Sequence, residues 1–351
     1  MNSKDERATS RDEVVDYDQT VKAILAFAAL VVHDGVACRS GAEFGVGRRM
    51  STSANNPIQP SSEITPDLVA QKSATYGVAA EAKKSLDRDE SHWERHINQL
   101  RKYDDSLLGW WTEDETIKRS DAVMLVHHSR SRPFTRVLAQ AANADPEAVG
   151  PNSCVVEFIN SLETASYYFF RLEYGNIGDS ELASRLADGV QIPLDEVLRS
   201  FPNVRYYDSE PPLPRLLTDL WTDVLPAMAA DSEYDDDLKA YRVYASVKAV
   251  TSELQRAYGS KTLRMDSRSA EFPRQIWVKN AFERFCAYGL ATPPSNGSDV
   301  FEIHYRPFRK DVLERFIGLG LDRKRTQATG REDGIKEDTL FPELGASEIA
   351  I

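Results

Sequence analysis

The sequence predicts an α/β protein whose mixed central β-sheet is flanked by helices and followed by a smaller, mostly helical unit. Two β-rich apolar runs, at residues 64–70 and 76–82, flank a polar turn, which is typical of a β-hairpin. Residues 91–111 carry apolar side chains at near-helical spacing, and residues 121–128 have the length and composition of a buried strand. The apolar stretch at residues 21–37 predicts a first helix before the hairpin. This order favours one mixed sheet with helices on its faces.

The predicted hairpin places two carboxylates opposite each other. If the turn is centred on Ala74, Asp67 faces Glu81, and directly opposed residues bring their Cβ atoms to roughly 4.5–5.5 Å. Side chains alternate along a strand, so Glu81 and Lys83 share one face. Ala82 points to the packed side and leaves its carbonyl near the carboxylates. Two carboxylates, one carbonyl and one ammonium group are therefore expected to converge.

A cluster of this kind has the composition of a divalent-cation site. Two carboxylates this close repel each other, and one would take up a proton unless a cation balanced them. Mg²⁺ prefers oxygen ligands and is usually held by one or two carboxylates together with substrate phosphate. The residues therefore predict a Mg²⁺ or Mn²⁺ site formed by Asp67, Glu81 and the Ala82 carbonyl, with Lys83 beside it to orient water. A solvated hairpin with charged ends is the alternative.

Pro66, Asp67, Glu81 and Lys83 together resemble the motif of the PD-(D/E)xK nuclease superfamily. The resemblance implies a restriction-endonuclease-like core and metal-dependent hydrolysis of phosphodiester bonds, with Asp67, Glu81 and Lys83 as catalytic residues. It also implies products that carry a 5′-phosphate and a 3′-hydroxyl. It covers roughly residues 16–159, which is less than half of the chain.

A second element of this resemblance lies on the helix predicted after the hairpin. Gln99 and Tyr103 are four residues apart and share a helical face. The run QLRKY is similar to the QxxxY element of the RecB-like branch, which implies that both residues belong to the catalytic site; core packing is the alternative for the tyrosine. Some members add an acidic metal ligand in or after the first helix. Glu43 is the nearest candidate, and His33 and Asp34 compete with it.

The net charge of −12 argues mildly against nucleic-acid binding, because Lys and Arg supply most of the affinity for phosphates. Basic residues nevertheless gather near the predicted site, so a basic groove on an acidic protein is expected. The residues predicted to contact nucleic acid are Arg48, Arg49, Lys84, Arg130 and Arg132. Arg130 and Arg132 are expected in a loop after the buried strand, where loops of a restriction-endonuclease-like fold face substrate.

A second unit is expected after an acidic run. Residues 238–258 and 275–288 look helical, and residues 300–305 follow a turn as a strand, an order that resembles a winged-helix domain. Arg274, Lys279 and Arg284 lie on or near its candidate recognition helix. The predicted organisation is a disordered N-terminus (1–15), a nuclease-like domain (16–230), an acidic linker (231–237), a winged-helix-like domain (238–322) and a disordered C-terminal tail (323–351).

Composition sets the remaining limits. The chain has 351 residues, 41% of them hydrophobic, which is enough for two domains with their own cores. No apolar stretch reaches the length of a membrane span, and the N-terminal residues lack the pattern of a secretion signal, so a cytoplasmic protein without membrane association is expected. The three cysteines are far apart and lack CxxC spacing, which argues against a disulfide framework or a structural zinc site.

The function expected from these features is that of a Mg²⁺-dependent DNA endonuclease, with a role in DNA defence or repair suggested by the family alone. A homodimer or a protein partner is possible, and RNA is an alternative substrate. The competing hypothesis is a non-catalytic DNA-binding or regulatory protein, in which the nuclease-like domain is a scaffold and the winged helix binds.

Overall fold

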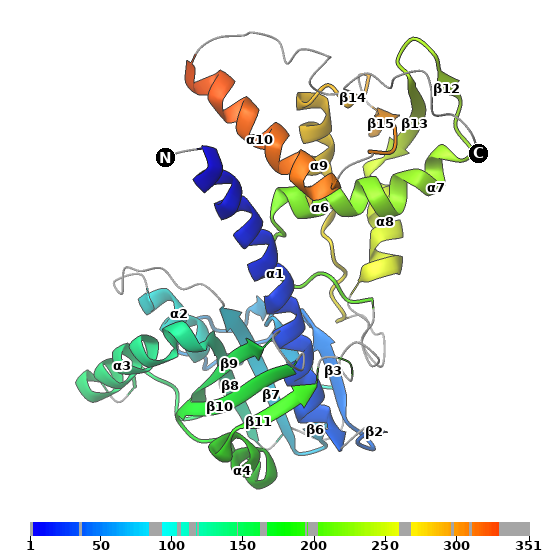
Figure 1. Ribbon diagram of the computed structural model, residues 1–351. Helices are drawn as coiled ribbons and strands as arrows, with labels where there is room; N and C mark the ends of the chain where they lie inside the picture. Colours follow the sequence, from blue (N-terminus) through cyan, green and yellow to red (C-terminus); the bar gives the residue numbers. More distant parts are fainter. Residues whose placement is uncertain are drawn as a thin grey trace. The chain divides into compact units, whose positions relative to one another are not determined.

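The structure is a computed structural model of the chain (Figure 1). The residues that it describes are 3–34, 37–83, 93–103, 107–111, 117, 119–145, 147–161, 167–193, 195, 203–259, 268–295, 298–308 and 311–329. Tertiary contacts divide the chain into two units. The large unit comprises Val15–Pro211 and Ser252–Arg274, and the small unit comprises Met1–Val14, Pro212–Thr251 and Gln275–Ile351.

Within the described residues, the large unit is built on a seven-stranded mixed sheet in the order β11-β10-β9-β8-β7-β6-β3 (Figure 1). Strand β8 is parallel to both β7 and β9, and the other neighbouring pairs are antiparallel. The strands are β3 (Glu43–Val46), β6 (Leu68–Ser73), β7 (Tyr76–Lys83), β8 (Arg119–His127), β9 (Ser153–Ser161), β10 (Tyr167–Tyr174) and β11 (Val190–Pro193).

Four helices accompany this sheet: α1 (Ser3–Val32), α2 (Glu94–Arg101), α3 (His128–Ala144) and α4 (Ser180–Asp188). Two short strand pairs lie beside it: β1 (His33–Asp34) with β2 (Ala37–Cys38), and β4 (Met50–Ser51) with β5 (Glu63–Ile64). The prediction of an α/β protein with a mixed central sheet flanked by helices is thus confirmed.

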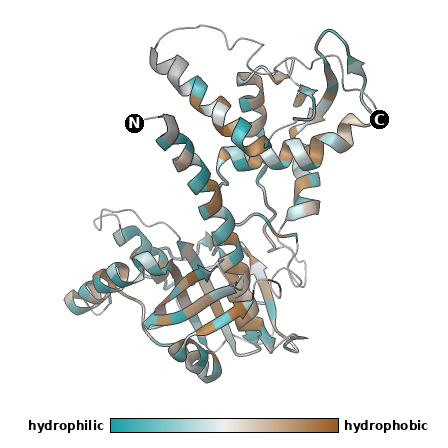
Figure 2. Cartoon of the chain, in the orientation of Figure 1, coloured by the Kyte–Doolittle hydropathy of each residue, from teal (hydrophilic) through white to brown (hydrophobic). Residues whose placement is uncertain are grey.

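The alternation of side chains along the strands fills one core on each face of the sheet. One core contains Phe27 of α1, whose ring packs on Phe170 of β10 with centroids 5.5 Å apart, and it extends to α4. The other core contains Trp93 and Phe134, which pack on each other at 5.6 Å and hold the α2 and α3 regions against the sheet. Figure 2 shows that apolar residues are frequent on the strands of this sheet.

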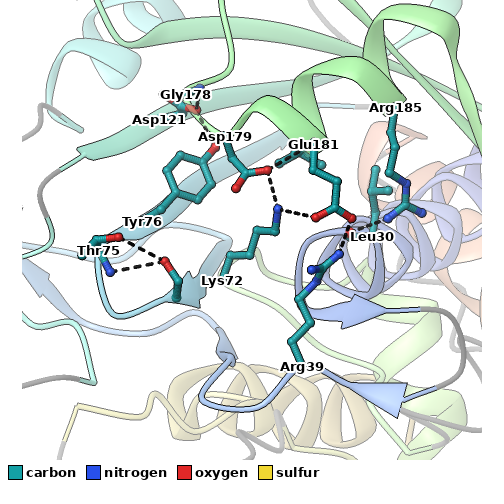
Figure 3. Close-up of polar contacts among 12 residues, drawn as sticks. Leu30, Arg39, Lys72, Thr75, Tyr76, Asp121, Gly178, Asp179, Glu181 and Arg185 are labelled. Carbon is teal, nitrogen blue, oxygen red and sulfur yellow. Dashed lines mark hydrogen bonds and ion pairs between the residues drawn. The ribbon is translucent and has the colours of Figure 1, made fainter.

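Ion pairs of the buried Lys72 connect the start of α4 to the end of β6 (Figure 3). Lys72 Nζ donates to Asp179 Oδ1 and lies 3.1 Å from Glu181 Oε2, and only 8% of the Lys72 side chain is exposed. Asp179 is also the N-cap of α4, where its carboxylate accepts a hydrogen bond from the Leu182 amide at 2.8 Å. The ammonium group and the helix cap therefore share one carboxylate, which fixes where α4 begins.

We expect that replacing Lys72 with Met lowers the free energy of unfolding by about 2–3 kcal/mol, because two carboxylates lose the buried cation between them. Urea denaturation measures this loss. The matched control is Arg256→Met, which breaks an exposed pair with Glu253 and should change the free energy of unfolding much less than Lys72→Met does. Equal losses in the two variants would contradict the assigned role of Lys72.

The small unit contains helical segments and an antiparallel sheet in the order β12-β13-β15-β14. Its strands are β12 (Tyr234–Asp235), β13 (Ala240–Ser246), β14 (Ala291–Thr292) and β15 (Val300–Tyr305). Its helical segments are α6 (Leu213–Asp219), a π-helical turn (Leu220–Val224), α7 (Leu225–Ala229), the start of α8 (Val247–Tyr258), α9 (Gln275–Ala287) and α10 (Val312–Thr329). Trp221 packs in its core against Phe285 and Phe316.

Several predicted boundaries differ from the structure. The helix predicted at residues 238–258 is wrong in its first third, because residues 240–246 form β13, whose alternating burial fits a strand paired with β15. The acidic run contains β12, which pairs with β13, and the division between the units falls at Pro211 and Pro212 instead. The first helix begins at Ser3, where Asp5 and Glu6 suit a helix N-terminus, so residues 3–15 are helical.

The C-terminal boundary also moves, because α10 continues to Thr329, and the rest of the predicted disordered tail lies outside the described residues. In the part of the chain that the structure describes, no helix combines the length and apolar character needed to cross a membrane.

Candidate functional site

The carboxylates of Asp67 and Glu81 lie together at the end of the β6–β7 pair. Leu68 of β6 faces Ala80 of β7, and continuing this antiparallel register by one residue places Asp67 opposite Glu81, as the sequence predicts. Asp67 Oδ2 accepts a hydrogen bond of 2.9 Å from the Ala82 amide. Both carboxylates are almost completely buried, with Asp67 4% and Glu81 2% exposed. Two acidic groups are therefore held side by side away from solvent.

This pair has an electrostatic cost. Burial, and then the charge of Glu81, raise the pKa of Asp67 well above its usual range. The neighbouring Lys83 only partly offsets this effect, although its Nζ lies 3.3 Å from Glu81 Oε2. Burial by itself lowers the pKa of Lys83, but the charges of Glu81 and Asp67 outweigh it and raise the pKa above its usual value. The Lys83 ammonium group stays charged, and one quarter of its side chain is exposed.

Tyr103 completes the inner part of the site. Its hydroxyl donates a hydrogen bond to Glu81 Oε1, and its backbone carbonyl accepts one from Asn152 Nδ2 at 2.9 Å. Burial, followed by the charge of Glu81, raises the pKa of Tyr103, so the phenol keeps its proton; a side-chain hydrogen bond with Gln99 acts in the opposite direction. The structure thus brings Gln99, Tyr103 and Glu81 together, a position that fits what the resemblance to the QxxxY element implies.

We expect Tyr103→Phe to lower the free energy of unfolding by about 1–3 kcal/mol, because the buried Glu81 carboxylate loses a hydrogen-bond donor. The loss is measured by urea denaturation, with Tyr244→Phe as the control, since Tyr244 is 61% exposed. Wild-type stability of Tyr103→Phe would show that the phenol does not support Glu81.

The predicted orientation of the alternating residues is also found. Ala82 packs in the core on the α1 face of the sheet, opposite to the face that carries Glu81 and Lys83. A metal contact of the Ala82 carbonyl stays a prediction. Among the described residues, no group of three or more His, Cys, Asp and Glu side chains is placed to share one metal ion. The two carboxylates that the structure places together are those of Asp67 and Glu81.

The prediction that Glu43 is an additional acidic metal ligand does not fit the structure. Glu43 faces Gln71 across β3 and β6, four residues along the strand from Asp67, which corresponds to about 13 Å at about 3.3 Å per residue. Its competitors His33 and Asp34 form β1, which pairs with β2 and not with the strands of the site. The first helix ends at Val32, and β3 begins with Glu43. Glu43 therefore lies at the end of β3 that is farther from Asp67.

The residues predicted to contact nucleic acid differ in their exposure. Arg48 is 1% exposed, its Nε donates to the Gly109 carbonyl at 2.8 Å, and its guanidinium lies 4.0 Å from the centre of the Trp111 ring. Arg48 is therefore part of the interior, and its assignment as a nucleic-acid contact does not fit this position. Arg49 is half exposed and lies 3.5 Å from Glu63, an ion pair that a phosphate could replace.

Two other predicted contacts lie in a helix, and one cannot be placed. Arg130 and Arg132 fall in the first turns of α3, which begins at His128 directly after β8, so the predicted loop is absent at this point of the described chain. Arg132 is exposed and Arg130 is half-buried. Lys84 lies outside the described residues.

Two residues that sequence reasoning missed lie next to the carboxylates. Tyr207 is buried. Burial, and to a smaller extent the charge of Asp67, raise the pKa of Tyr207 to about 12. Burial also raises the pKa of Asp208 to about 6; Arg274 and Lys83 oppose the shift, and Glu81 adds to it. More than 120 residues separate Tyr207 and Asp208 from β7. No spacing in the sequence predicts that they lie near the carboxylates in space.

Comparisons with models of known protein families, with curated proteins and with solved structures give no match.

Proposed function

We propose that this protein is a metal-dependent endonuclease that hydrolyses phosphodiester bonds in DNA. The observation that carries this proposal is the buried pair of Asp67 and Glu81, with the charged amine of Lys83 beside it. A protein gains no stability from placing two carboxylates together in its interior. Such an arrangement is typical of sites at which a cation and a phosphate are handled.

The order of elements around the pair supports a restriction-endonuclease-like core. Apart from the short strands β1, β2, β4 and β5, the described chain runs from a helix (α1) through three antiparallel strands (β3, β6 and β7) and a helix (α2) to a strand (β8) parallel to β7. This is the α-β-β-β-α-β order expected from the PD-(D/E)xK resemblance. Asp67 directly precedes β6, Glu81 lies near the end of β7, and Lys83 is the last residue of β7.

The residues fit a divalent cation of the Mg²⁺ type. Asp67 and Glu81 would hold it, because their two buried carboxylates lie side by side and offer oxygen ligands to one cation. Two carboxylates are a usual protein contribution to a Mg²⁺ site, in which water and substrate phosphate supply the other ligands. Bound there, the cation would polarise the phosphodiester and promote loss of a proton from the attacking water.

The other side chains have roles that follow from their contacts. Lys83, partly exposed and charged, can hold the attacking water and stabilise the charge that develops on the phosphoryl oxygens. Tyr103 fixes the Glu81 carboxylate by its hydrogen bond, and Gln99 in turn contacts Tyr103. Tyr103 and Gln99 therefore orient a carboxylate and do not need to touch the substrate.

The test is incubation of the purified chain with supercoiled plasmid, linear duplex, single-stranded DNA and RNA, each with Mg²⁺, Mn²⁺ or EDTA. The proposal predicts cleavage of DNA that requires the metal and leaves 5′-phosphate ends. Cleavage of RNA alone would overturn the assignment of DNA as substrate. Absence of cleavage of every substrate, under conditions in which the protein is folded, would argue against an enzyme.

A second candidate function is binding without cleavage, and the small unit favours it. In this unit β13 precedes α9, β14 and β15, and β15 pairs with both β13 and β14, which is an arrangement similar to a winged helix. On α9, Lys279 lies 3.8 Å from Glu283, and Ile276 is 55% exposed. A cavity of about 690 Å³ beside this face is lined by Val247, Ile276, Pro293, Pro294, Asp299 and Phe301, among others.

A gel-shift assay separates the two functions. DNA binding that persists in EDTA, without cleavage in Mg²⁺ or Mn²⁺, would favour the binding protein. Metal-dependent cleavage that is lost in Glu81→Gln would favour the nuclease.

A further inference from the structure

A polyanionic substrate at two carboxylates needs positive charge beyond that of Lys83. The predicted arginines leave this need partly unmet, since Arg48 is buried among protein groups. Two chain segments, which contain Asp208 and Arg274, provide another cation. Both belong to the large unit, although they are far from the hairpin in sequence.

The segment of Asp208 is fixed from several directions. The ring of Tyr207 packs on Tyr17 of α1 with centroids 5.0 Å apart, and the Tyr17 hydroxyl donates to the Ser209 carbonyl at 3.2 Å. On its other side, Arg205 lies 3.9 Å from the centre of the Tyr258 ring. The packing of Tyr207 and Arg205 and the hydrogen bond to Ser209 thus fix the backbone on both sides of Asp208.

The segment of Arg274 is attached to the strand end that carries Asp67. The Arg49 amide donates to the Arg268 carbonyl at 2.9 Å. Phe272 packs so closely on Gly47 that a Cβ at this glycine would lie 2.2 Å from the ring, and the Gly47 amide donates to the Asp67 carbonyl at 3.0 Å. Arg274 lies two residues beyond Phe272, so its backbone is placed near the site.

Asp208 connects this arginine to the carboxylate pair. Arg274 Nη2 donates to Asp208 Oδ1 in an ion pair. The Asp208 carboxyl also interacts electrostatically with the charges of Glu81 and Lys83. Its side chain is 16% exposed, whereas half of the Arg274 side chain is exposed. One carboxylate therefore holds a partly open guanidinium beside the candidate site.

We propose that Arg274, positioned by Asp208, forms a phosphate-binding subsite next to the Asp67–Glu81 pair. This inference rests on the proposed function and names the residue that contacts the backbone of its phosphodiester substrate. A guanidinium group presents five donors in a planar fork, so it can keep one contact with a carboxylate while it binds phosphate oxygens. Arg274 is the contacting residue, and Asp208 is a positioning residue.

The experiment compares wild type with Arg274→Ala, Arg274→Lys and Asp208→Asn. Cleavage of a DNA duplex in Mg²⁺ gives kcat and KM, and binding of a short fluorescein-labelled duplex in EDTA is measured over a range of salt concentrations. The control is Arg256→Ala, because Arg256 is exposed and pairs with Glu253. Thermal melting of each variant checks that it is folded.

We expect Arg274→Ala to raise KM about tenfold with little change in kcat, and to reduce the slope of log Kd against log salt by about one. Arg274→Lys should restore part of the affinity, because an ammonium group keeps the charge but loses the fork. Asp208→Asn should weaken binding in the wild-type background and have no further effect when combined with Arg274→Ala. Arg256→Ala should behave like wild type.

The outcomes separate the subsite from the proposed function. If wild type cleaves DNA and Arg274→Ala keeps its KM and salt slope, the subsite is wrong and the nuclease stands. If wild type cleaves nothing but Arg274→Ala still loses affinity and slope in EDTA, the phosphate subsite is supported and the nuclease is wrong. If wild type neither cleaves nor shows a change of binding in the variant, both are wrong.

Discussion

Glu81→Gln and Lys83→Ala should each lower the rate of metal-dependent DNA cleavage on the order of 10³-fold. Glutamine keeps the shape of Glu81 and can still accept the hydrogen bond from Tyr103, but it lacks the charge that a divalent cation needs. Lys83→Ala removes the ammonium group that lies 3.3 Å from Glu81. The measurement is the single-turnover rate on a labelled duplex at saturating enzyme.

The control for these variants is Glu253→Gln, which changes an exposed glutamate that pairs with Arg256 on the surface of the large unit. It should cleave like wild type. Binding in EDTA should change little in Lys83→Ala compared with its cleavage rate, because the predicted loss concerns chemistry. Cleavage at the wild-type rate in either site variant would show that the nuclease activity resides elsewhere.

Asp67→Asn should stabilise the metal-free protein at neutral pH by about 1–3 kcal/mol, which corresponds to a rise in Tm of roughly 2–6 °C. Burial and Glu81 raise the pKa of Asp67, so the folded wild type loses stability as the pH rises through that pKa. Asparagine has no such titration, and it can still accept from the Ala82 amide and donate to Glu81. The difference between the variant and wild type should therefore be small at acidic pH and grow as the pH rises.

Added Mg²⁺ or Mn²⁺ should reverse the order. Wild type gains stability from a ligand that binds only the folded state, whereas Asp67→Asn has lost one of the two charged ligands. Thermal melting between pH 4 and 8, with and without metal, measures both effects. A metal-free Asp67→Asn protein that is less stable than wild type at pH 8 would contradict the electrostatic description of the pair.

The hairpin could be predicted from the sequence because its signals are local. Apolar runs on both sides of a polar turn fix the register, and the register alone brings Asp67 opposite Glu81. The spacing of Gln99 and Tyr103 is a second local signal: it places both residues on one helical face, and their place beside Glu81 is implied only by the family resemblance.

Errors arose where tertiary pairing decides the structure. Residues 240–246 resemble the start of a helix, yet pairing with β15 makes them a strand. Arg48 looks like a surface cation, and only the fold shows that Trp111 covers it. Glu43 follows the first helix, as the family resemblance implies for an extra acidic ligand. Antiparallel pairing of β3 with β6 places it opposite Gln71, four residues along the strand from Asp67.

The missed residues have a common reason. Tyr207, Asp208 and Arg274 reach the hairpin through the packing of Tyr207 on Tyr17 and of Phe272 on Gly47, contacts that join segments far apart in the chain. No periodicity or motif in one sequence encodes such a return. The candidate site therefore has a part that spacing predicts, Asp67, Glu81, Lys83 and Tyr103, and a part that only the fold assembles.

The central claim is that Asp67 and Glu81 hold a divalent cation. Anomalous diffraction from a crystal soaked in Mn²⁺ tests it most directly, at a concentration that supports cleavage. We predict a peak between the two carboxylates, with oxygen atoms at roughly 2.0–2.3 Å, that disappears in Asp67→Asn. Mn²⁺ peaks elsewhere with none between Asp67 and Glu81, or a peak that persists in Asp67→Asn, would contradict the claim.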